Sequence, residues 1–103
     1  MYYIESEIRM TEGINELTLG FHNINQLRID YLNTEDEIQI ASYPTKQEFK
    51  DKKPASKIVR FMIDYDVHDY NLDPNLFALR LLISHGGIFY KKEIKKVYDM
   101  TLS

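Results

Sequence analysis

The chain contains no cysteine and no tryptophan, and alanine occurs only three times among its 103 residues. The absence of cysteine excludes disulfide bonds, zinc ribbons, thiolate nucleophiles and iron–sulfur clusters, so that noncovalent packing must supply the stability. Long apolar runs are also missing, since none approaches the roughly 20 residues that a membrane-spanning helix needs. The charges in the N-terminal segment MYYIESEIRM come too early and too often for a signal peptide. We therefore expect a soluble, cytoplasmic protein with no membrane contact.

The remaining composition is that of a folded protein with an uneven charge distribution. Hydrophobic residues make up 44% of the chain and charged residues 28%, and the length suits one domain covering residues 1–103. Residues 1–45 contain eight acidic and two basic residues, whereas residues 46–103 contain eight acidic and eleven basic residues. The net charge of −3 is far from that of a nucleic-acid-binding domain with a pI above about 9.

Alternating polar and apolar residues predict strands over most of the first two thirds of the chain. The expected strands cover residues 2–10, 15–21, 24–32, 37–43 and 57–67. Thr11-Glu12-Gly13 suits a three-residue hairpin, His22-Asn23 suits a two-residue turn, and residues 33–36 suit another turn. Such regular turns predict an antiparallel meander of about five strands.

Two segments carry helix signals. Thr45 and Glu48 have capping-box spacing and predict one short helical turn, which Pro54 limits in length. Asp73-Pro74 predicts the start of a second helix, and Gly86 or Gly87 predicts its end. This second helix is apolar almost all round, so we expect it to be buried against the sheet. A strand over residues 76–83 is the rival interpretation.

The C-terminal segment, residues 88–102, fits either a helix or an extra strand. A helical stripe of Tyr90, Ile94, Val97 and Tyr98 favours the helix. The fold class predicted from these elements is α+β: the meander, the buried helix, and a C-terminal helix or extra strand.

The stretch MIDYDVHDYNLDP, residues 62–74, is rich in acidic residues. Asp64, Asp66, His68 and Asp69 could together bind Mg²⁺ or Mn²⁺, but their spacing fails the EF-hand pattern, which requires glycine at position 6 and glutamate at position 12. Strand alternation explains the acids more simply, as the solvated face of residues 57–67. We therefore expect no metal and no cofactor.

No catalytic motif is visible in the sequence. His22 is interpreted as a turn residue and His85 as a residue near a helix C-terminus, where it would interact favourably with the helix dipole. Neither histidine lies in a sequence motif that suggests nucleophilic catalysis. Gly86-Gly87 follows a helix instead of preceding one, which is the wrong end for a phosphate site.

Basic and aromatic residues provide the candidate contact surface. Eight tyrosines exceed what a core requires, and aromatic residues are enriched in protein interfaces, although half-buried strands also favour tyrosine. Lysine clusters beside aromatic residues can also bind single-stranded nucleic acid, but acidic residues dilute these clusters. The candidate interaction residues are Asp64, Asp66, Tyr43, Phe49, Lys50, Lys52, Lys53, Tyr90, Lys91, Lys92, Lys95 and Lys96.

The sequence favours a small non-catalytic protein-binding module or inhibitor. Twelve isoleucines and nine lysines resemble translation from an AT-rich genome, which would suit a phage or mobile-element protein that acts on a host enzyme. Anti-CRISPR proteins are an analogy for such a role. Two alternatives remain open: a structural component that self-assembles through a sheet edge, and a small Mg²⁺- or Mn²⁺-dependent enzyme that uses the Asp64, Asp66 and His68 face.

Overall fold

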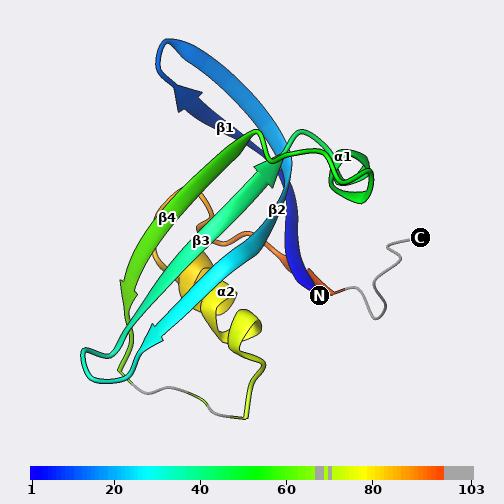
Figure 1. Cartoon of the computed structure of the whole chain (residues 1–103). Coiled ribbons are helices and arrows are strands. Elements are labelled where there is room, and N and C mark those ends of the chain that lie inside the picture. The colour runs from blue at the N-terminus through cyan, green and yellow to red at the C-terminus, as the bar shows by residue number, and fades with distance from the viewer. Residues whose placement is uncertain (67–68, 70, 97–103) are drawn as a thin grey trace.

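A computed structural model describes residues 1–66, 69 and 71–96 of the chain. The elements are β1 (Tyr2–Glu12), β2 (Asn15–Asp30), β3 (Glu35–Tyr43), α1 (Lys46–Lys50), β4 (Lys57–Asp64), α2 (Pro74–Ser84) and β5 (Ile94–Lys96). The strands form one antiparallel sheet in the order β4-β3-β2-β1-β5 (Figure 1). The predicted α+β class with an antiparallel meander is confirmed at this level. No helix among the described residues is long and apolar enough to cross a membrane.

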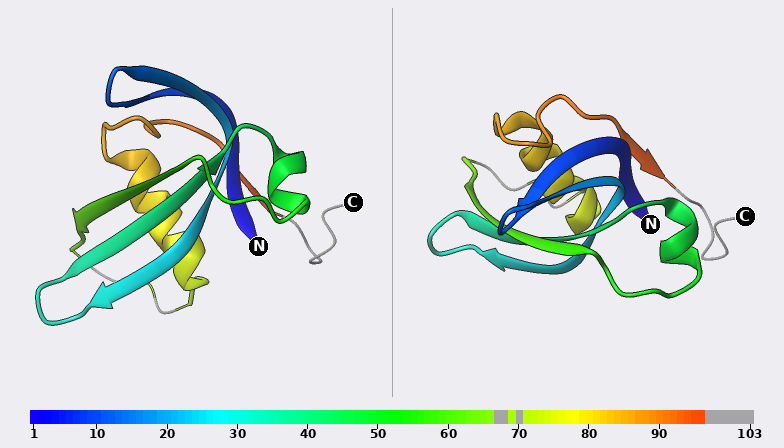
Figure 2. Two further views of the ribbon diagram at one scale, coloured as in Figure 1. Left: turned by 45° about the horizontal axis from the view of Figure 1, so that its top comes forward. Right: turned by 90° about the horizontal axis from the view of Figure 1, so that it is seen from above.

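The two helices pack on different faces of the sheet (Figure 2). Helix α2 covers what we term the inner face, where it buries Ala78, Leu79 and Leu82 against Ile38 and Ile40 of β3. Helix α1 packs at one end of the opposite, outer face. The rest of the outer face, formed by β2, β3 and β4, lies open.

Local signals place α2 as predicted. The side chain of Asp73 accepts hydrogen bonds from the backbone N–H groups of Asn75 and Leu76, at 2.8 and 3.3 Å, and Pro74 takes the first helical position. Gly86 has a φ of +72°, a conformation that glycine adopts without strain, directly after the helix ends. The rival strand over residues 76–83 is therefore wrong.

The predicted turn at His22-Asn23 is wrong. Strand β2 runs without interruption from Asn15 to Asp30, and both residues pair with β3, His22 with Ser42 and Asn23 with Ala41. His22 is fully buried on the inner face, so that it is not a turn residue. The polar dipeptide resembled a turn because its hydrogen-bond partners are distant in the sequence.

Other element boundaries differ from the predictions. The first hairpin has two loop residues, Gly13 and Ile14, instead of three, and Gly13 has the positive φ that a two-residue turn needs. The β2–β3 turn spans residues 31–34, and β3 begins at Glu35. Strand β4 ends at Asp64 instead of residue 67, which lies outside the described residues.

The C-terminal segment forms an extra strand where it is described. The three residues of β5 pair with Tyr2, Tyr3 and Ile4 of β1, and residues 88–91 form a turn. The preferred helical stripe is therefore wrong at Tyr90 and Ile94, because pairing with the open edge of β1 overrides the helical spacing. Val97 and Tyr98 lie outside the described residues.

Candidate interaction surfaces

The acidic stretch of residues 62–74 is divided among separate structural roles. Asp64 is exposed at the end of β4, and Asp66 is exposed just beyond it. The carboxylate of Asp69 accepts a hydrogen bond from the backbone N–H of Asn71 at 2.9 Å, while Asp73 caps α2. His68 lies outside the described residues. Among the residues that the structure describes, no three acidic or histidine side chains form a group that could hold a metal ion.

His22 and Ser42 form a buried polar pair that the sequence did not reveal. The Nδ1 atom of His22 lies 2.7 Å from Ser42 Oγ, and its Nε2 lies 2.9 Å from the carbonyl oxygen of Ser6. Because a carbonyl oxygen only accepts hydrogen bonds, Nε2 must donate, which leaves Nδ1 to accept the Ser42 hydroxyl proton. This is the arrangement of a serine with its general base. Both side chains are fully buried, however, so the hydroxyl group is not exposed to solvent.

The environment of His22 keeps its imidazole neutral. Burial lowers the pKa of His22 below its ordinary value, and the nearby charge of Lys92 lowers it further. The backbone hydrogen bonds to Ser6 and Leu19 raise the pKa, but less than burial lowers it. Phe89 packs edge-on against the imidazole ring, with 5.1 Å between the ring centroids. The pair is therefore a structural link between β2, β3 and β1.

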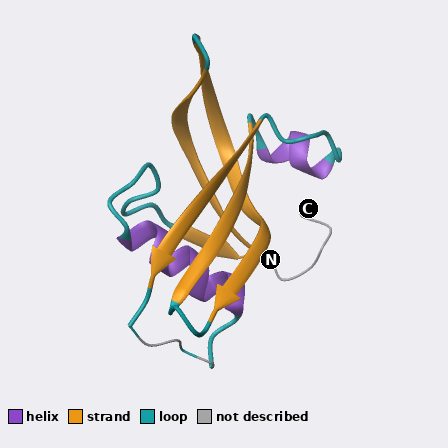
Figure 3. Cartoon of the chain, turned by 60° about the vertical axis from the view of Figure 1, so that its left-hand side comes forward, coloured by secondary structure: helices purple, strands orange, loops and turns teal. Residues whose placement is uncertain are grey.

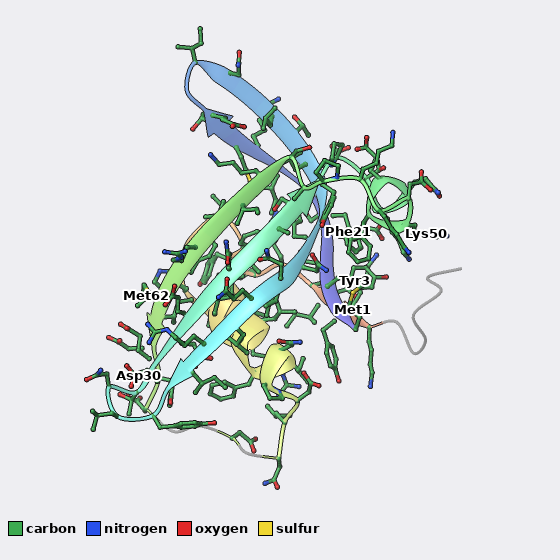
Figure 4. All side chains as sticks on the ribbon, in the orientation of Figure 1. Met1, Tyr3, Phe21, Asp30, Lys50 and Met62 are labelled. Atoms are coloured by element: carbon green, nitrogen blue, oxygen red, sulfur yellow. The ribbon has the colours of Figure 1, made fainter. Side chains whose placement is uncertain are left out.

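Tyr43 and Phe49, two of the predicted contact residues, belong to an aromatic cluster that docks α1 onto the sheet. Phe21 stacks on Tyr3 at 5.1 Å and on Phe49 at 4.9 Å between ring centroids. Tyr43 meets both Phe21 and Phe49 edge-on. Figure 4 shows Tyr3 and Phe21 close to α1. Because Tyr43 and Phe49 are half-buried in this cluster, their role as contact residues stays a prediction.

The candidate lysines lie in three separate segments of the chain. Lys50 ends α1, and Lys52 and Lys53 follow it. Lys91 ends the turn after α2, and Lys92 follows that turn. The third pair, Lys95 and Lys96, belongs to β5. The structure therefore does not bring all twelve candidate contact residues into one surface.

Several lysines already contact aromatic or acidic side chains of the chain itself. The Nζ of Lys91 lies 5.3 Å from the ring centroid of Tyr90, and that of Lys96 lies 5.1 Å from the ring centroid of Tyr2. Lys95 forms a salt bridge with Glu5 at 3.3 Å. These contacts give the lysines a structural role without nucleic acid.

Charge is nevertheless separated along the strands of the sheet. At one end of the outer face, Glu35 of β3 stands directly between Asp30 of β2 and Asp64 of β4. At the opposite end of β4, the strand begins with Lys57, which follows the basic segment after α1 in the sequence. Figure 4 shows Asp30 and Lys50 at opposite ends of the molecule.

The open outer face is the surface that sequence reasoning missed. Gln26 and Arg28 of β2 and Glu37 and Gln39 of β3 line a small open hollow on it. Glu37 joins two strands by salt bridges, to Arg28 Nη2 at 2.7 Å and to Arg60 Nε at 3.2 Å. The alternation of β3 and β4 carried the signal for this face, but the sequence could not show which face a helix would cover.

Strand β4 combines this open face with a free edge. Among the described residues, β4 is the last strand of the sheet and pairs only with β3, and Figure 3 turns its edge toward the viewer. On its outer face, Ile58 and Met62 keep 49% and 48% of their surface exposed. Apolar side chains at this exposure, on an edge strand, are typical of strands that accept another strand.

The direction of the backbone groups of β4 follows from one hydrogen bond. Tyr65 N–H donates to Thr34 O at 2.9 Å, and the register continues as Ile63 opposite Asp36 and Phe61 opposite Ile38. Because hydrogen-bonded and non-hydrogen-bonded pairs alternate in an antiparallel ladder, odd-numbered residues of β4 bond to β3. The N–H and C=O groups of the even-numbered residues therefore point to the free edge; these residues are Ile58, Arg60, Met62 and Asp64.

No protein-family model, curated protein or solved structure matches the chain.

Proposed function

We propose that the chain is a non-catalytic protein-binding module that adds an extended segment of a partner to the free edge of β4. The observation that carries the proposal is the coincidence, on one eight-residue strand, of outward backbone groups and exposed apolar side chains. Main-chain hydrogen bonds would supply affinity, and the alternating side chains would supply specificity.

The side chains of β4 fit this role because they combine apolar area with charge. Ile58 and Met62 offer exposed apolar contact area, while Arg60 and Asp64 offer charges of opposite sign on the same face. Opposite charges fix the register of an added strand, because a one-step slip removes the favourable pairs. An inhibitor of a host enzyme would use this same edge.

The lysines near β5 and after α2 give less support to a nucleic-acid-binding function than β4 gives to a protein-binding function. The lysines of β5 and of the turn after α2 contact Glu5, Tyr2 and Tyr90 of the chain itself. With a net charge of −3, the chain also lacks the electrostatic attraction that drives nucleic-acid binding. A protein partner is therefore preferred to nucleic acid.

The test is affinity capture from a lysate with the tagged wild type and two variants, read by quantitative mass spectrometry. Met62→Lys places a charge at the centre of the exposed strand. Ile14→Lys makes the same kind of change at the tip of the β1–β2 hairpin, where the isoleucine is fully exposed. We expect a protein that is captured by the wild type and Ile14→Lys but reduced at least about tenfold with Met62→Lys.

Equal capture by the two variants would contradict the proposed surface. Loss with Ile14→Lys alone would move the contact to the hairpin. If the wild type captures only further copies of the chain itself, a partner of another sequence is excluded. Self-association would then be the remaining use of this edge.

A further inference from the structure

We propose that the strand added to β4 is β4 of a second copy of this chain, paired antiparallel about a two-fold axis at Met62. This inference rests on the proposed function and deepens it, since it names the occupant of the same edge. The order of charges along the strand is what favours a second copy.

Only a few registers are open to two copies of β4. A hydrogen-bonded antiparallel pair places an outward-pointing residue opposite another outward-pointing residue, so the even-numbered residues of the two copies must face each other. With Met62 on the axis, Arg60 of each copy stands opposite Asp64 of the other, and Met62 meets Met62. This register gives two opposite-charge pairs flanking an apolar contact.

Neighbouring registers lose this complementarity. An axis at Arg60 would place two arginines opposite each other, and an axis at Asp64 would oppose two aspartates; like charges in directly opposite positions are destabilising. An axis at Phe61 would place Arg60 opposite Met62, and one at Ile63 would place Met62 opposite Asp64. Only the axis at Met62 pairs Arg60 with Asp64 within β4.

The single chain leaves Asp64 with unfavourable neighbours. Glu35 stands directly opposite Asp64, and Asp30 stands opposite Glu35, so three carboxylates form one row across the sheet. Among the described residues, Asp64 makes no salt bridge. Arg60 of a second copy would enter this row from the open side.

Arg60 is already positioned for that contact. Its Nε lies 3.2 Å from Glu37 Oε1, which keeps the guanidinium group on the outer face while 62% of the side chain stays exposed. A guanidinium group has five N–H donors, so that Arg60 can contact Glu37 and a second carboxylate together. The network Arg28–Glu37–Arg60 would thus continue to Asp64 of the second copy.

The apolar residues also complement each other in this register. On the inner face, Phe61 would stand opposite Ile63 of the second copy, and Phe61 is only half-buried in the single chain. Phe89 packs edge-on against the Phe61 ring, with 5.8 Å between the ring centroids. Pairing would therefore extend the inner core across the new edge.

At the opposite edge of the sheet, the described strand β5 (Ile94–Lys96) pairs with Tyr2, Tyr3 and Ile4 of β1 and contains two lysines. Lysine on an edge strand is a common protection against edge pairing. Charged residues on β4 would protect it in the same way if they had one sign. Because they are opposite in sign and lie on either side of Met62, they favour pairing about that residue instead.

The test is sedimentation equilibrium of the purified chain between about 1 µM and about 1 mM, since a single short strand pair gives a weak interface. We expect a monomer at the lower end and a dimer at the upper end. Met62→Lys would oppose two lysines on the axis and weaken the dimer at least about tenfold, whereas Ile14→Lys would leave it unchanged.

A charge exchange tests the register itself. Arg60→Asp alone would place two carboxylates in each flanking pair, and Asp64→Arg alone would place two guanidinium groups there, so each variant should fail to dimerise. In a mixed dimer of the two variants, each flanking pair joins a carboxylate of one chain to a guanidinium group of the other. The mixture should therefore associate more tightly than either variant alone. Thermal denaturation of each variant checks that it folds; if Arg60→Asp does not, the comparison of Met62→Lys with Ile14→Lys decides.

The outcomes separate this inference from the proposed function. If the chain stays monomeric at every concentration, and Met62→Lys still fails to capture a protein that the wild type captures, a second copy does not occupy the edge of β4. The proposed protein-binding function would then still stand. A dimer that Met62→Lys does not weaken, or a mixture that associates no better than the separate variants when both fold, overturns pairing through β4 about Met62.

Discussion

His22 and Ser42 face each other across β2 and β3, with His22 Nδ1 2.7 Å from Ser42 Oγ and both side chains fully buried. The contact joins two residues that are 20 positions apart in the sequence. It explains why a histidine occupies the middle of a long strand. A neutral imidazole suits this site, because both of its nitrogen atoms have a partner.

The buried His22 makes stability depend on pH. Because burial lowers the pKa of His22 in the folded state, the unfolded chain binds the proton more readily. The contribution of His22 to stability is therefore complete above its unfolded pKa of about 6.5 and decreases as the pH falls toward the lowered folded pKa. Urea denaturation at pH 7.5 and pH 5.5 measures this difference.

A matched pair of variants isolates the histidine responsible. His22→Gln should show a smaller loss of stability between the two pH values than the wild type, whereas His85→Gln, at an exposed site, should keep the full loss. Ser42→Ala should lower the free energy of unfolding by about 1–2 kcal/mol, since it leaves Nδ1 without a partner. Equal pH dependence in the two glutamine variants would contradict this role of His22.

The cap of α2 should contribute measurably to stability. Asp73→Ala removes the acceptor of two backbone N–H groups and should lower the free energy of unfolding by about 1 kcal/mol. Asp69→Ala removes an acceptor of one N–H group in the preceding loop and should have a smaller effect. Thermal denaturation compares the two; a larger loss for Asp69→Ala would refute the capping assignment.

The aromatic cluster should decide whether α1 stays docked. Phe49→Ala removes the ring that stacks on Phe21 and should lower the free energy of unfolding by about 2 kcal/mol. Lys50→Ala, one residue further along, should change it by less than about 0.5 kcal/mol. Near-ultraviolet circular dichroism should also lose intensity in Phe49→Ala alone. Similar losses in both variants would argue against packing of α1 through Phe49.

Replacing the central carboxylate of the row at the end of the sheet by a cation should stabilise the protein. Glu35→Lys places a cation between Asp30 and Asp64 and should raise the free energy of unfolding by about 0.5 kcal/mol at low salt. The gain should shrink as added salt screens the charges. Glu12→Lys makes the same change in net charge at the β1–β2 hairpin and serves as the control. No difference between the variants would show that the row is not destabilising.

The accuracy of the sequence predictions depended on how far each signal reached along the chain. Helix α2 was predictable because Asp73, Pro74 and Gly86 act on their nearest neighbours. The short helix α1 was predictable for the same reason, since Thr45 Oγ1 accepts a hydrogen bond from Glu48 N–H at 3.3 Å.

Elements that depend on pairing between distant residues were not predicted correctly: β2 was predicted as two strands, and a helix was preferred in place of β5. The unbroken course of β2 depends on the partners of His22 in β1 and β3, and β5 forms because Ile94 pairs with Ile4 at the other end of the chain. Both relationships are set by the packed sheet and leave no local pattern.

The candidate surface was predictable only in part for the same reason. Alternation along residues 57–67 predicts that one side of the strand faces water, and Asp64 is among the predicted contact residues. The sequence could not show that β4 would be the edge of the sheet. Arg60 and Met62 were therefore missed, since their importance depends on the open edge and on Glu37 of the neighbouring strand.

Amide hydrogen exchange in β4, measured residue by residue by NMR at about 10 µM and about 1 mM protein, tests whether the edge of β4 pairs with another strand. We expect the amides of Arg60, Met62 and Asp64 to exchange quickly in the dilute sample and to become protected in the concentrated one. The amides of Val59, Phe61 and Ile63, which already bond to β3, should be protected at both concentrations. Fast exchange of Arg60, Met62 and Asp64 in the concentrated sample would contradict strand pairing at this edge.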